Sequence, residues 1–177
     1  MRINFYDTAK VNSAYISDFE SSIKEIVLRN KTLVNGPFTK MLEEKLSGYV
    51  GSKYCVHVSS GLDALRLSLR SHGIGCGDRV LLPVHSYIAA WIPVLELGAI
   101  PVGITVDEGS LLLSFEELNR TDLTNISAIM PVHLYGQACD IDRIGELAEK
   151  YQIPIIEDAA QAHGAVINGK KIGSHNT

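Results

Sequence analysis

The stretch IPIIEDAAQAHGA, residues 153–165, carries the pattern that decides the expected fold. It begins with a short apolar run, residues 153–156, of the kind that forms a strand buried on both faces. The run ends in Glu157 and Asp158, and a carboxylate at the end of a buried strand is partly desolvated unless a cationic group meets it. From position alone, Asp158 fits two interpretations equally: a ligand for a cation, or the N-cap of a following helix.

The rest of the chain alternates between short apolar strands and helical patterns. The predicted strands cover residues 54–58, 79–84, 101–106, 126–132 and 153–158, with a further short strand expected at 165–168. The predicted helices cover residues 16–30, 38–50, 59–73, 85–98, 114–120 and 140–152, and the segments 59–73 and 85–98 each begin with a turn. This order predicts an α/β fold, with a mostly parallel sheet and helices on both of its faces.

Polar side chains follow four of these strands at the point where each strand ends. They are Ser59 to Gly61, His85 to Tyr87, His133 to Gly136, and Asp158 with Gln161 and His163. Ligands of open α/β sheets bind beyond the carboxyl ends of the strands. The loops that enter the strands are ordinary turns, so the sequence predicts a polar pocket on one rim of the sheet.

Each part of this predicted pocket has a functional and a structural interpretation. The turn at Ser59–Gly61 leads into a helix, whose free N–H groups and dipole favour an anion such as phosphate. The same turn is also compatible with a plain N-cap, followed by Asp63 in the first helical turn. Tyr87 is able to stack on a planar ligand, although a tyrosine at a helix start more often packs in the core. His133 and His163 are more often structural histidines than catalysts.

Composition excludes several classes of function. The 177 residues carry a net charge of −4 without a basic stripe, so no nucleic-acid partner is expected. No apolar stretch reaches the roughly 18 residues that span a bilayer, and the N-terminus lacks the apolar core of a secretory signal. Cys55, Cys76 and Cys139 are odd in number and far apart, without zinc-ligand spacing. We therefore expect a soluble, cytoplasmic protein with reduced thiols, no metal and no membrane contact.

At these residues the sequence resembles the DegT/DnrJ/StrS family of pyridoxal-phosphate-dependent sugar aminotransferases. The matching stretches are VSSGLDALRLSL (58–69), LLPVHSYIAA (81–90), IMPVHLYGQACDID (129–142) and IEDAAQAHGA (156–165), preceded by NGPFTKMLEEKLSGYVGSKYCV (35–56). The resemblance implies the large-domain fold of type I aminotransferases. It also implies an N-terminal helical segment over residues 1–50 and part of the cofactor-binding domain over residues 51–177, with the C-terminal domain absent.

The resemblance implies roles for several residues of the predicted pocket. Asp158 matches the aspartate that pairs with the protonated pyridine nitrogen of pyridoxal phosphate, which answers why a carboxylate ends the strand. Gln161 matches the residue near the 3-hydroxyl of the ring, and Tyr87 matches the aromatic residue that stacks on it. Ser86 matches a polar residue near the cofactor or the substrate.

The 5′-phosphate of the cofactor is expected at Ser60, Gly61 and Leu62, which match the family's phosphate-binding turn. The family usually has threonine at the position of Leu62. A contact from the backbone N–H group to phosphate survives that change, whereas a side-chain contact does not.

The family's Schiff-base lysine lies downstream of the aspartate, in a Ser-Phe-x-x-x-Lys segment. KIGSHNT (171–177) resembles the run that leads into that segment, so we expect the lysine to lie outside this chain. Lys170 and Lys171 match a solvent-exposed hairpin of the family and are not expected to replace it. With no catalytic lysine, the chain is expected to bind the cofactor but to be inactive alone.

The resemblance implies glutamate and a nucleotide-linked keto sugar as substrates, and a homodimer as the assembly. Two alternatives stay open at this point. One is parentage in the lysine-less sugar dehydratases of the same family, and the other is a non-enzymatic α/β binding module. A Rossmann dinucleotide-binding protein is disfavoured, because no GxGxxG motif follows the first strand.

Overall fold

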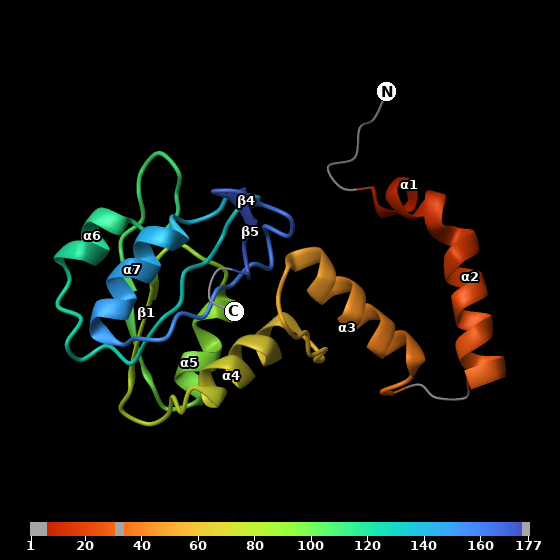
Figure 1. Ribbon diagram of the computed structural model, residues 1–177, viewed down its shortest axis with the longest axis horizontal. Helices are drawn as coiled ribbons and strands as arrows, with labels where there is room; N and C mark the ends of the chain where they lie inside the picture. The colour runs from red at the N-terminus through yellow and green to blue at the C-terminus, as the bar shows by residue number, and fades with distance from the viewer. Residues whose placement is uncertain (1–6, 31–33, 175–177) are drawn as a thin grey trace. The chain divides into compact units, whose positions relative to one another are not determined.

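The computed structural model describes residues 7–30 and 34–174 of the chain (Figure 1). The chain consists of two compact units, Met1–Lys45 and Leu46–Thr177. In the first unit, α1 (Thr8–Asn12), η1 (Ser13–Tyr15), α2 (Ile16–Lys24) and the π-helical η2 (Glu25–Asn30) follow one another. The predicted helix at 16–30 is confirmed, with its last turn wound more widely than an α-helix. Helix α3 (Pro37–Val50) begins in this unit and ends in the second.

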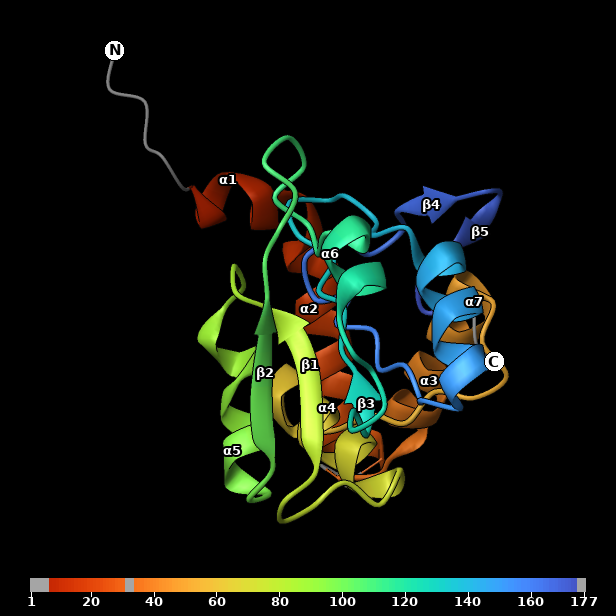
Figure 2. The same cartoon turned by 90° about the vertical axis from the view of Figure 1, so that its left-hand side faces the viewer.

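The second unit contains the sheet and all of the predicted pocket residues. Its elements are α4 (Gly61–Ser71), β1 (Arg79–Pro83), η3 (Ile88–Ala90), α5 (Ile92–Glu96), β2 (Ile100–Ile104), α6 (Phe115–Arg120), β3 (Ala128–Ile129), α7 (Ile141–Tyr151), β4 (Val166–Ile167) and β5 (Lys170–Lys171). The main sheet has the strand order β2-β1-β3, and both neighbours of β1 run parallel to it (Figure 2).

Residues 153–158 extend this sheet beyond β3 without forming a continuous strand. Parallel bridges join Ile155 to Ile129 and Asp158 to Val132. The predicted strands at 126–132 and 153–158 are therefore shorter than expected. The physical reason is proline: Pro131 and Pro154 both lie in this ladder, and neither has an N–H group to donate.

Helices cover both faces of the sheet, as the sequence predicts. The chain passes from β1 to β2 through α5, and from β3 to residues 153–158 through α7, in opposite directions along the sheet. Because such crossovers are right-handed, α5 and α7 lie on opposite faces. Helix α4 packs on α5, and α6 packs on α7 (Figure 1). Buried on both sides, β1 is apolar throughout its centre, and Val80, Leu81 and Leu82 are fully buried.

Three further predictions need correction. Residues 54–58 form no strand, since they join neither the β2-β1-β3 sheet nor the β4-β5 hairpin, and Tyr54 and Val56 are 75% and 78% exposed. The predicted helix at 85–98 is divided into η3 and α5, where Pro93 occupies the first turn of α5. The strand expected at 165–168 belongs to a separate antiparallel hairpin, β4-β5, instead of the main sheet.

Candidate functional site

A cavity of about 530 Å³ lies at the carboxyl rim of the sheet. Six residues predicted for the cofactor site line it together: Ser60, Gly61, Leu62, Tyr87, Asp158 and Gln161. The remaining wall is apolar and comes from Leu65, Ile88, Ala89, Ile92, Val132, Leu134 and Ala160. The structure therefore brings segments separated by up to a hundred residues into one cavity.

The topology of the sheet explains why the cavity forms at this place. After β1 the chain leaves toward β2, and after β3 it leaves toward residues 153–158 on the other side of the sheet. The loops that follow β1 and β3 therefore diverge and leave a crevice at the carboxyl ends of the two strands. Tyr87 comes from the first loop, and Leu134 comes from the second. The N-terminus of α4 and the turn after Asp158 complete the wall.

The N-terminus of α4 presents backbone donors to the cavity. Ser60 has extended backbone angles, and its Oγ accepts a hydrogen bond from the Asp63 N–H group at 3.1 Å, so it is the N-cap of an 11-residue helix. The first N–H groups of a helix have no partner within it. At Gly61, a Cβ atom would meet nothing within 4 Å, so the space in front of this turn is open. The turn can receive an anion through Gly61 and Leu62.

An internal carboxylate already lies beside this turn. The hydroxyl groups of Ser59 and Ser60 donate to Asp63, and Arg66 forms an ion pair with it. The Ser59 hydroxyl holds the pKa of the Asp63 carboxyl below its usual value, and the charge of Arg66 lowers it further. An anion that binds at the N-terminus of α4 therefore competes with Asp63 for the two hydroxyl groups.

Asp158 is held by its backbone in the ladder and turns its side chain toward the cavity. Its N–H group donates to Pro131 at 3.0 Å, and its C=O group accepts from His133 at 2.9 Å. One carboxylate oxygen, Oδ1, accepts from the Ala160 N–H group at 3.1 Å. No helix follows in residues 159–174, so the interpretation of Asp158 as a helix N-cap is wrong. The hydrogen bond from Ala160 to Asp158 closes a turn instead. The half-buried carboxylate retains capacity for a cationic partner.

Gln161 and Tyr87 complete the polar part of the cavity. Gln161 is fixed by the turn after β3, because its Oε1 accepts from the Tyr135 N–H group at 3.3 Å and its C=O group accepts from Gly136 at 3.0 Å. Tyr87 is 69% exposed, so the interpretation that it packs in the core is wrong. The ring of Tyr87 is free to cover a planar ligand.

Ser86 does not line the cavity, although it precedes Tyr87. Its hydroxyl oxygen accepts a hydrogen bond from the indole N–H group of Trp91 at 3.1 Å. The Trp91 ring packs close to Gly103, where a Cβ atom would come within 3.2 Å of it. The predicted role of Ser86 near the cofactor or substrate stays a prediction.

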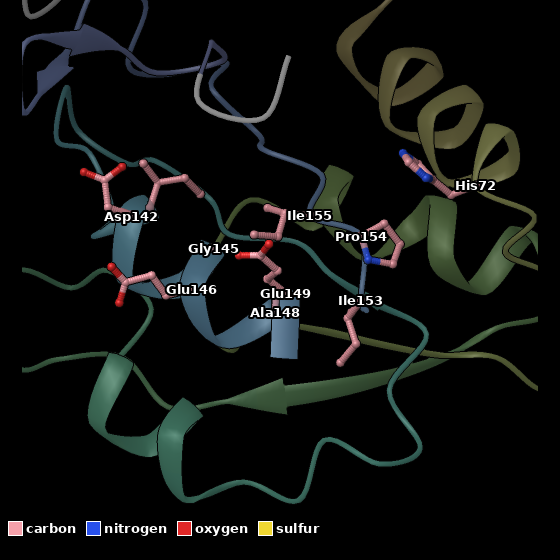
Figure 3. A pocket seen from close by; sticks show the side chains of 10 residues that line it. His72, Asp142, Gly145, Glu146, Ala148, Glu149, Ile153, Pro154 and Ile155 are labelled. Carbon is pink, nitrogen blue, oxygen red and sulfur yellow. The ribbon is translucent and has the colours of Figure 1, made fainter. Parts of the chain in front are cut away.

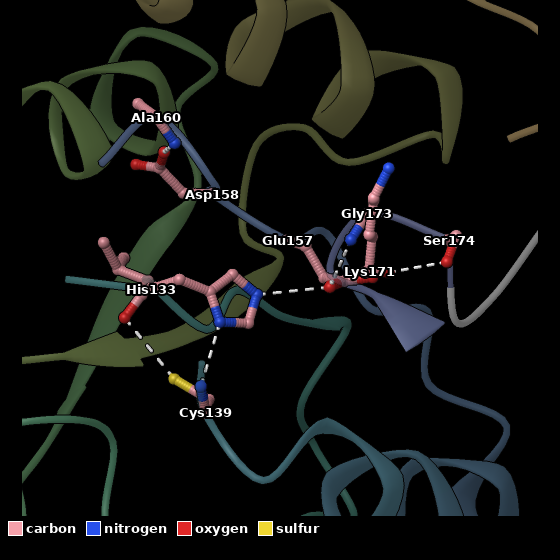
Figure 4. A network of polar contacts seen from close by, with 9 residues as sticks. His133, Cys139, Glu157, Asp158, Ala160, Lys171, Gly173 and Ser174 are labelled. Carbon is pink, nitrogen blue, oxygen red and sulfur yellow. Dashed lines mark hydrogen bonds and ion pairs between the residues drawn. The ribbon is translucent and has the colours of Figure 1, made fainter. Parts of the chain in front are cut away.

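The structure also shows a polar network that the sequence did not reveal (Figure 4). The fully buried His133 side chain contacts Glu157 through Nε2 at 3.1 Å, and its Nδ1 accepts from the Cys139 N–H group at 3.0 Å. Burial raises the pKa of the Cys139 thiol to about 11, with a smaller contribution from the Glu157 carboxylate. The acidic pair at 157–158 was visible in the sequence, but a role for Glu157 separate from that of Asp158 was not.

A second cavity of about 560 Å³ lies between α7 and residues 153–155 (Figure 3). Its polar lining is acidic, from Asp142, Glu146 and Glu149, with His72 opposite. None of the predicted site residues lines it, and its charge is unfavourable for a phosphate. Within residues 7–30 and 34–174, no group of three or more His, Cys, Asp or Glu side chains is placed to hold a metal ion. No described helix is long and apolar enough to cross a membrane.

The parallel sheet, the cavity at its switch point and the carboxylate at the end of residues 153–158 define a type I aminotransferase fold. The chain belongs to the DegT/DnrJ/EryC1/StrS aminotransferase family, whose sequence profile matches residues 15–177.

Relatives of known function support this assignment. The chain is 38% identical over 172 residues to a dTDP-3-amino-3,6-dideoxy-alpha-D-galactopyranose transaminase of Aneurinibacillus thermoaerophilus, covering 97% of this chain and 47% of that protein. It is 40% identical over 169 residues to a UDP-2-acetamido-2-deoxy-3-oxo-D-glucuronate aminotransferase of Pseudomonas aeruginosa, covering 96% and 47%. The chain thus spans about half the length of the curated relatives it matches.

Solved structures agree with the sequence relatives. A crystal structure of S. venezuelae DesV in complex with a ketimine intermediate superposes with a TM-score of 0.93 at 37% identity, covering 98% of this chain and 46% of that one. The structure of NtdA from Bacillus subtilis with bound PMP gives a TM-score of 0.85 at 28% identity, covering 96% and 40%. Pyridoxal phosphate is the cofactor of this family.

Proposed function

We propose that this chain is the cofactor-binding part of an aminotransferase that transfers an amino group, from glutamate, to a keto sugar carried on a nucleotide. The single observation that supports this most strongly is the shared cavity, in which the six predicted residues meet at the rim of the sheet. The names of the two relatives above describe amino transfer on nucleotide-linked sugars, which is the substrate class proposed here.

The residues of the cavity fit pyridoxal phosphate. The N-terminus of α4, with its open space at Gly61, suits the phosphate group. Asp158 suits the protonated pyridine nitrogen, which its carboxylate would keep charged. Tyr87 would cover the ring, and Gln161 would hydrogen-bond its hydroxyl group. The cofactor, when bound, supplies an electron sink for the charge that develops when a C–H bond beside the amino nitrogen breaks.

The described residues would hold the cofactor without a covalent bond. Covalent attachment needs a lysine, and none of the described residues that line the cavity is a lysine. The Lys171 ammonium group donates to the Tyr49 C=O group and lies over the Tyr49 ring, 3.6 Å from its centroid. We therefore propose that this chain alone binds the cofactor but does not transfer an amino group. We also propose that it pairs with a second copy, since Tyr54 and Val56 expose large apolar side chains.

The test is a titration of the chain with pyridoxal phosphate, followed by the absorbance of the ligand. Asp158→Asn keeps the shape but removes the charge, and we expect it to weaken binding by about tenfold or more. Asp122→Asn is the matched control, because Asp122 closes the same kind of turn, accepting from the Thr124 N–H group at 3.0 Å, outside the cavity. Equal affinity of the two variants would contradict the proposed role of Asp158.

Covalent attachment and activity are tested in the same samples. Borohydride reduction, denaturation and peptide mapping should find no cofactor attached to the segments that line the cavity, because none of the described residues that line it is a lysine. Cofactor on exposed lysines outside the cavity reflects the general reaction of its aldehyde with amines and is counted separately. Incubation with glutamate and a nucleotide-linked keto sugar should give no amino sugar above a blank without protein. Cofactor attached to a segment that lines the cavity, or turnover above the blank, would contradict the proposal.

A further inference from the structure

His133 is a fully buried polar residue for which the proposed function gives no role. Its Nδ1 accepts a hydrogen bond from the Cys139 N–H group, so Nδ1 carries no proton. The imidazole is therefore neutral with its proton on Nε2, which donates to Glu157 Oε2 at 3.1 Å. The geometry thus fixes one tautomer, and both ring nitrogens are used (Figure 4).

Glu157 connects this imidazole to a third segment. The same oxygen, Oε2, also accepts from the Gly173 N–H group at 3.0 Å, just after the β4-β5 hairpin. Successive residues of an extended segment point to opposite sides. Glu157 accordingly points to His133, while Asp158 points into the cavity (Figure 4). Glu157 and Asp158 are neighbours in the chain, so the hydrogen bonds of the Glu157 carboxylate anchor the segment that carries Asp158.

His133 holds the other side of the cavity through its backbone and its Nδ1. Its N–H group donates to the Asp158 C=O group at 2.9 Å. The bond from Cys139 to Nδ1 closes the loop 133–139, and the turn inside this loop donates two hydrogen bonds to Gln161. The imidazole thus links three segments: the loop that fixes Gln161, the segment end that carries Asp158, and the segment at Gly173.

We propose that His133 and Glu157 are positioning residues of the cofactor site, which fix Asp158 and Gln161 relative to the segment that leaves the hairpin at Gly173. Neither residue lines the cavity, so the pair acts through other residues and not by touching the ligand. This inference rests on the proposed function, since it assigns to the pair the placement of the residues proposed to hold pyridoxal phosphate.

Two substitutions of His133 separate its two hydrogen bonds. In His133→Asn, the amide oxygen reaches the position of Nδ1 and keeps the Cys139 bond, but the donor to Glu157 is lost. In His133→Gln, the amide nitrogen reaches the position of Nε2 and keeps the Glu157 bond, but the acceptor for Cys139 is lost. Glu157→Gln keeps an acceptor oxygen for both of its donors, whereas Glu157→Ala keeps none.

The first measurement is amide hydrogen exchange in the unliganded 177-residue chain, normalised to the amides of β1. The Gly173 amide should exchange about tenfold faster in His133→Asn and Glu157→Ala, and close to the parent rate in His133→Gln and Glu157→Gln. The Cys139 amide should show the reverse pattern between the two His133 variants. Unchanged exchange at Gly173 in both His133→Asn and Glu157→Ala would overturn the proposal.

The second measurement is the affinity for pyridoxal phosphate. His133→Asn should bind about tenfold more weakly than the parent chain, and this loss should disappear when Asp158→Asn is already present. The reason is that this variant keeps the Cys139 bond of the loop that fixes Gln161 and loses only the bond to Glu157, the neighbour of Asp158. Leu118→Ala, which opens a cavity beneath α6 at its one buried side chain, is the control for lost stability alone. The proposal would be overturned if the losses of affinity in His133→Asn and Asp158→Asn added up in the double variant. It would also be overturned if Leu118→Ala lost as much affinity as His133→Asn. If the parent chain does not bind pyridoxal phosphate, the proposed function fails, while the exchange pattern still decides whether the pair couples the three segments.

Discussion

Two carboxylates lie next to the cavity in opposite kinds of surroundings. Asp63, beside the N-terminus of α4, is held by Ser59, Ser60 and Arg66, partners that are three or four positions away in the sequence. Glu157, behind the cavity, is held by partners 24 and 16 positions away, and its side chain is only 9% exposed. The first arrangement is local and hydrated, whereas the second joins distant segments in the interior. The comparison predicts that only the second contributes strongly to folding.

The largest expected effect is that of Glu157→Ala on the free energy of unfolding. The substitution leaves two donors, the His133 Nε2–H and Gly173 N–H groups, without their acceptor in a buried place, which costs about 3 kcal/mol. Asp63→Ala should cost far less, because its partners are exposed and water replaces them. Urea unfolding of both variants measures the difference. Similar costs for the two substitutions would remove the distinction between the two regions.

A smaller effect is expected at alkaline pH, through Cys139. Burial raises the pKa of this thiol from 9.0 to about 11, so the unfolded chain loses the proton first as the pH rises. Stability should therefore fall between about pH 9 and 11, by roughly 1.4 kcal/mol per pH unit, from this residue alone. Unfolding of the parent chain and of Cys139→Ala at several pH values isolates the contribution. If the free energy of unfolding falls with pH equally in the two proteins over this range, burial does not raise the pKa of the Cys139 thiol.

These two regions also differ in how far the sequence could predict them. The N-cap at Ser60 depends on neighbours in the sequence, and it was one of the two interpretations of the pattern Ser-Ser-Gly before a helix. The other interpretation, a phosphate-binding turn, stays a prediction. The shared cavity was predicted from the rule that strand ends meet at one rim. The bond between His133 and Glu157 was not predicted, because it depends on which face of the 153–158 segment each residue takes. Two strands are shorter than predicted, because Pro131 and Pro154 interrupt the ladder, although both prolines were visible in the sequence.

The smallest effect concerns the hydroxyl group that caps α4. Ser60→Ala removes the acceptor of the Asp63 N–H group and should cost about 1 kcal/mol of stability. Ser114→Ala is the matched control, because Ser114 caps α6 in the same way, accepting from the Glu117 N–H group at 3.3 Å, away from the cavity. The two variants should lose similar stability in thermal unfolding.

Only Ser60→Ala should alter the binding of a phosphate group, because Ser60 lines the cavity and Ser114 does not. Its hydroxyl is shared with Asp63, so removing it leaves the backbone N–H groups of Gly61 and Leu62 as the donors that a phosphate meets. We expect pyridoxal phosphate to bind about threefold more weakly to Ser60→Ala and unchanged to Ser114→Ala, measured by absorbance titration. An equal loss in both variants would mean that the effect comes from helix stability, and a loss of a hundredfold would mean that the hydroxyl, and not the backbone, carries the phosphate.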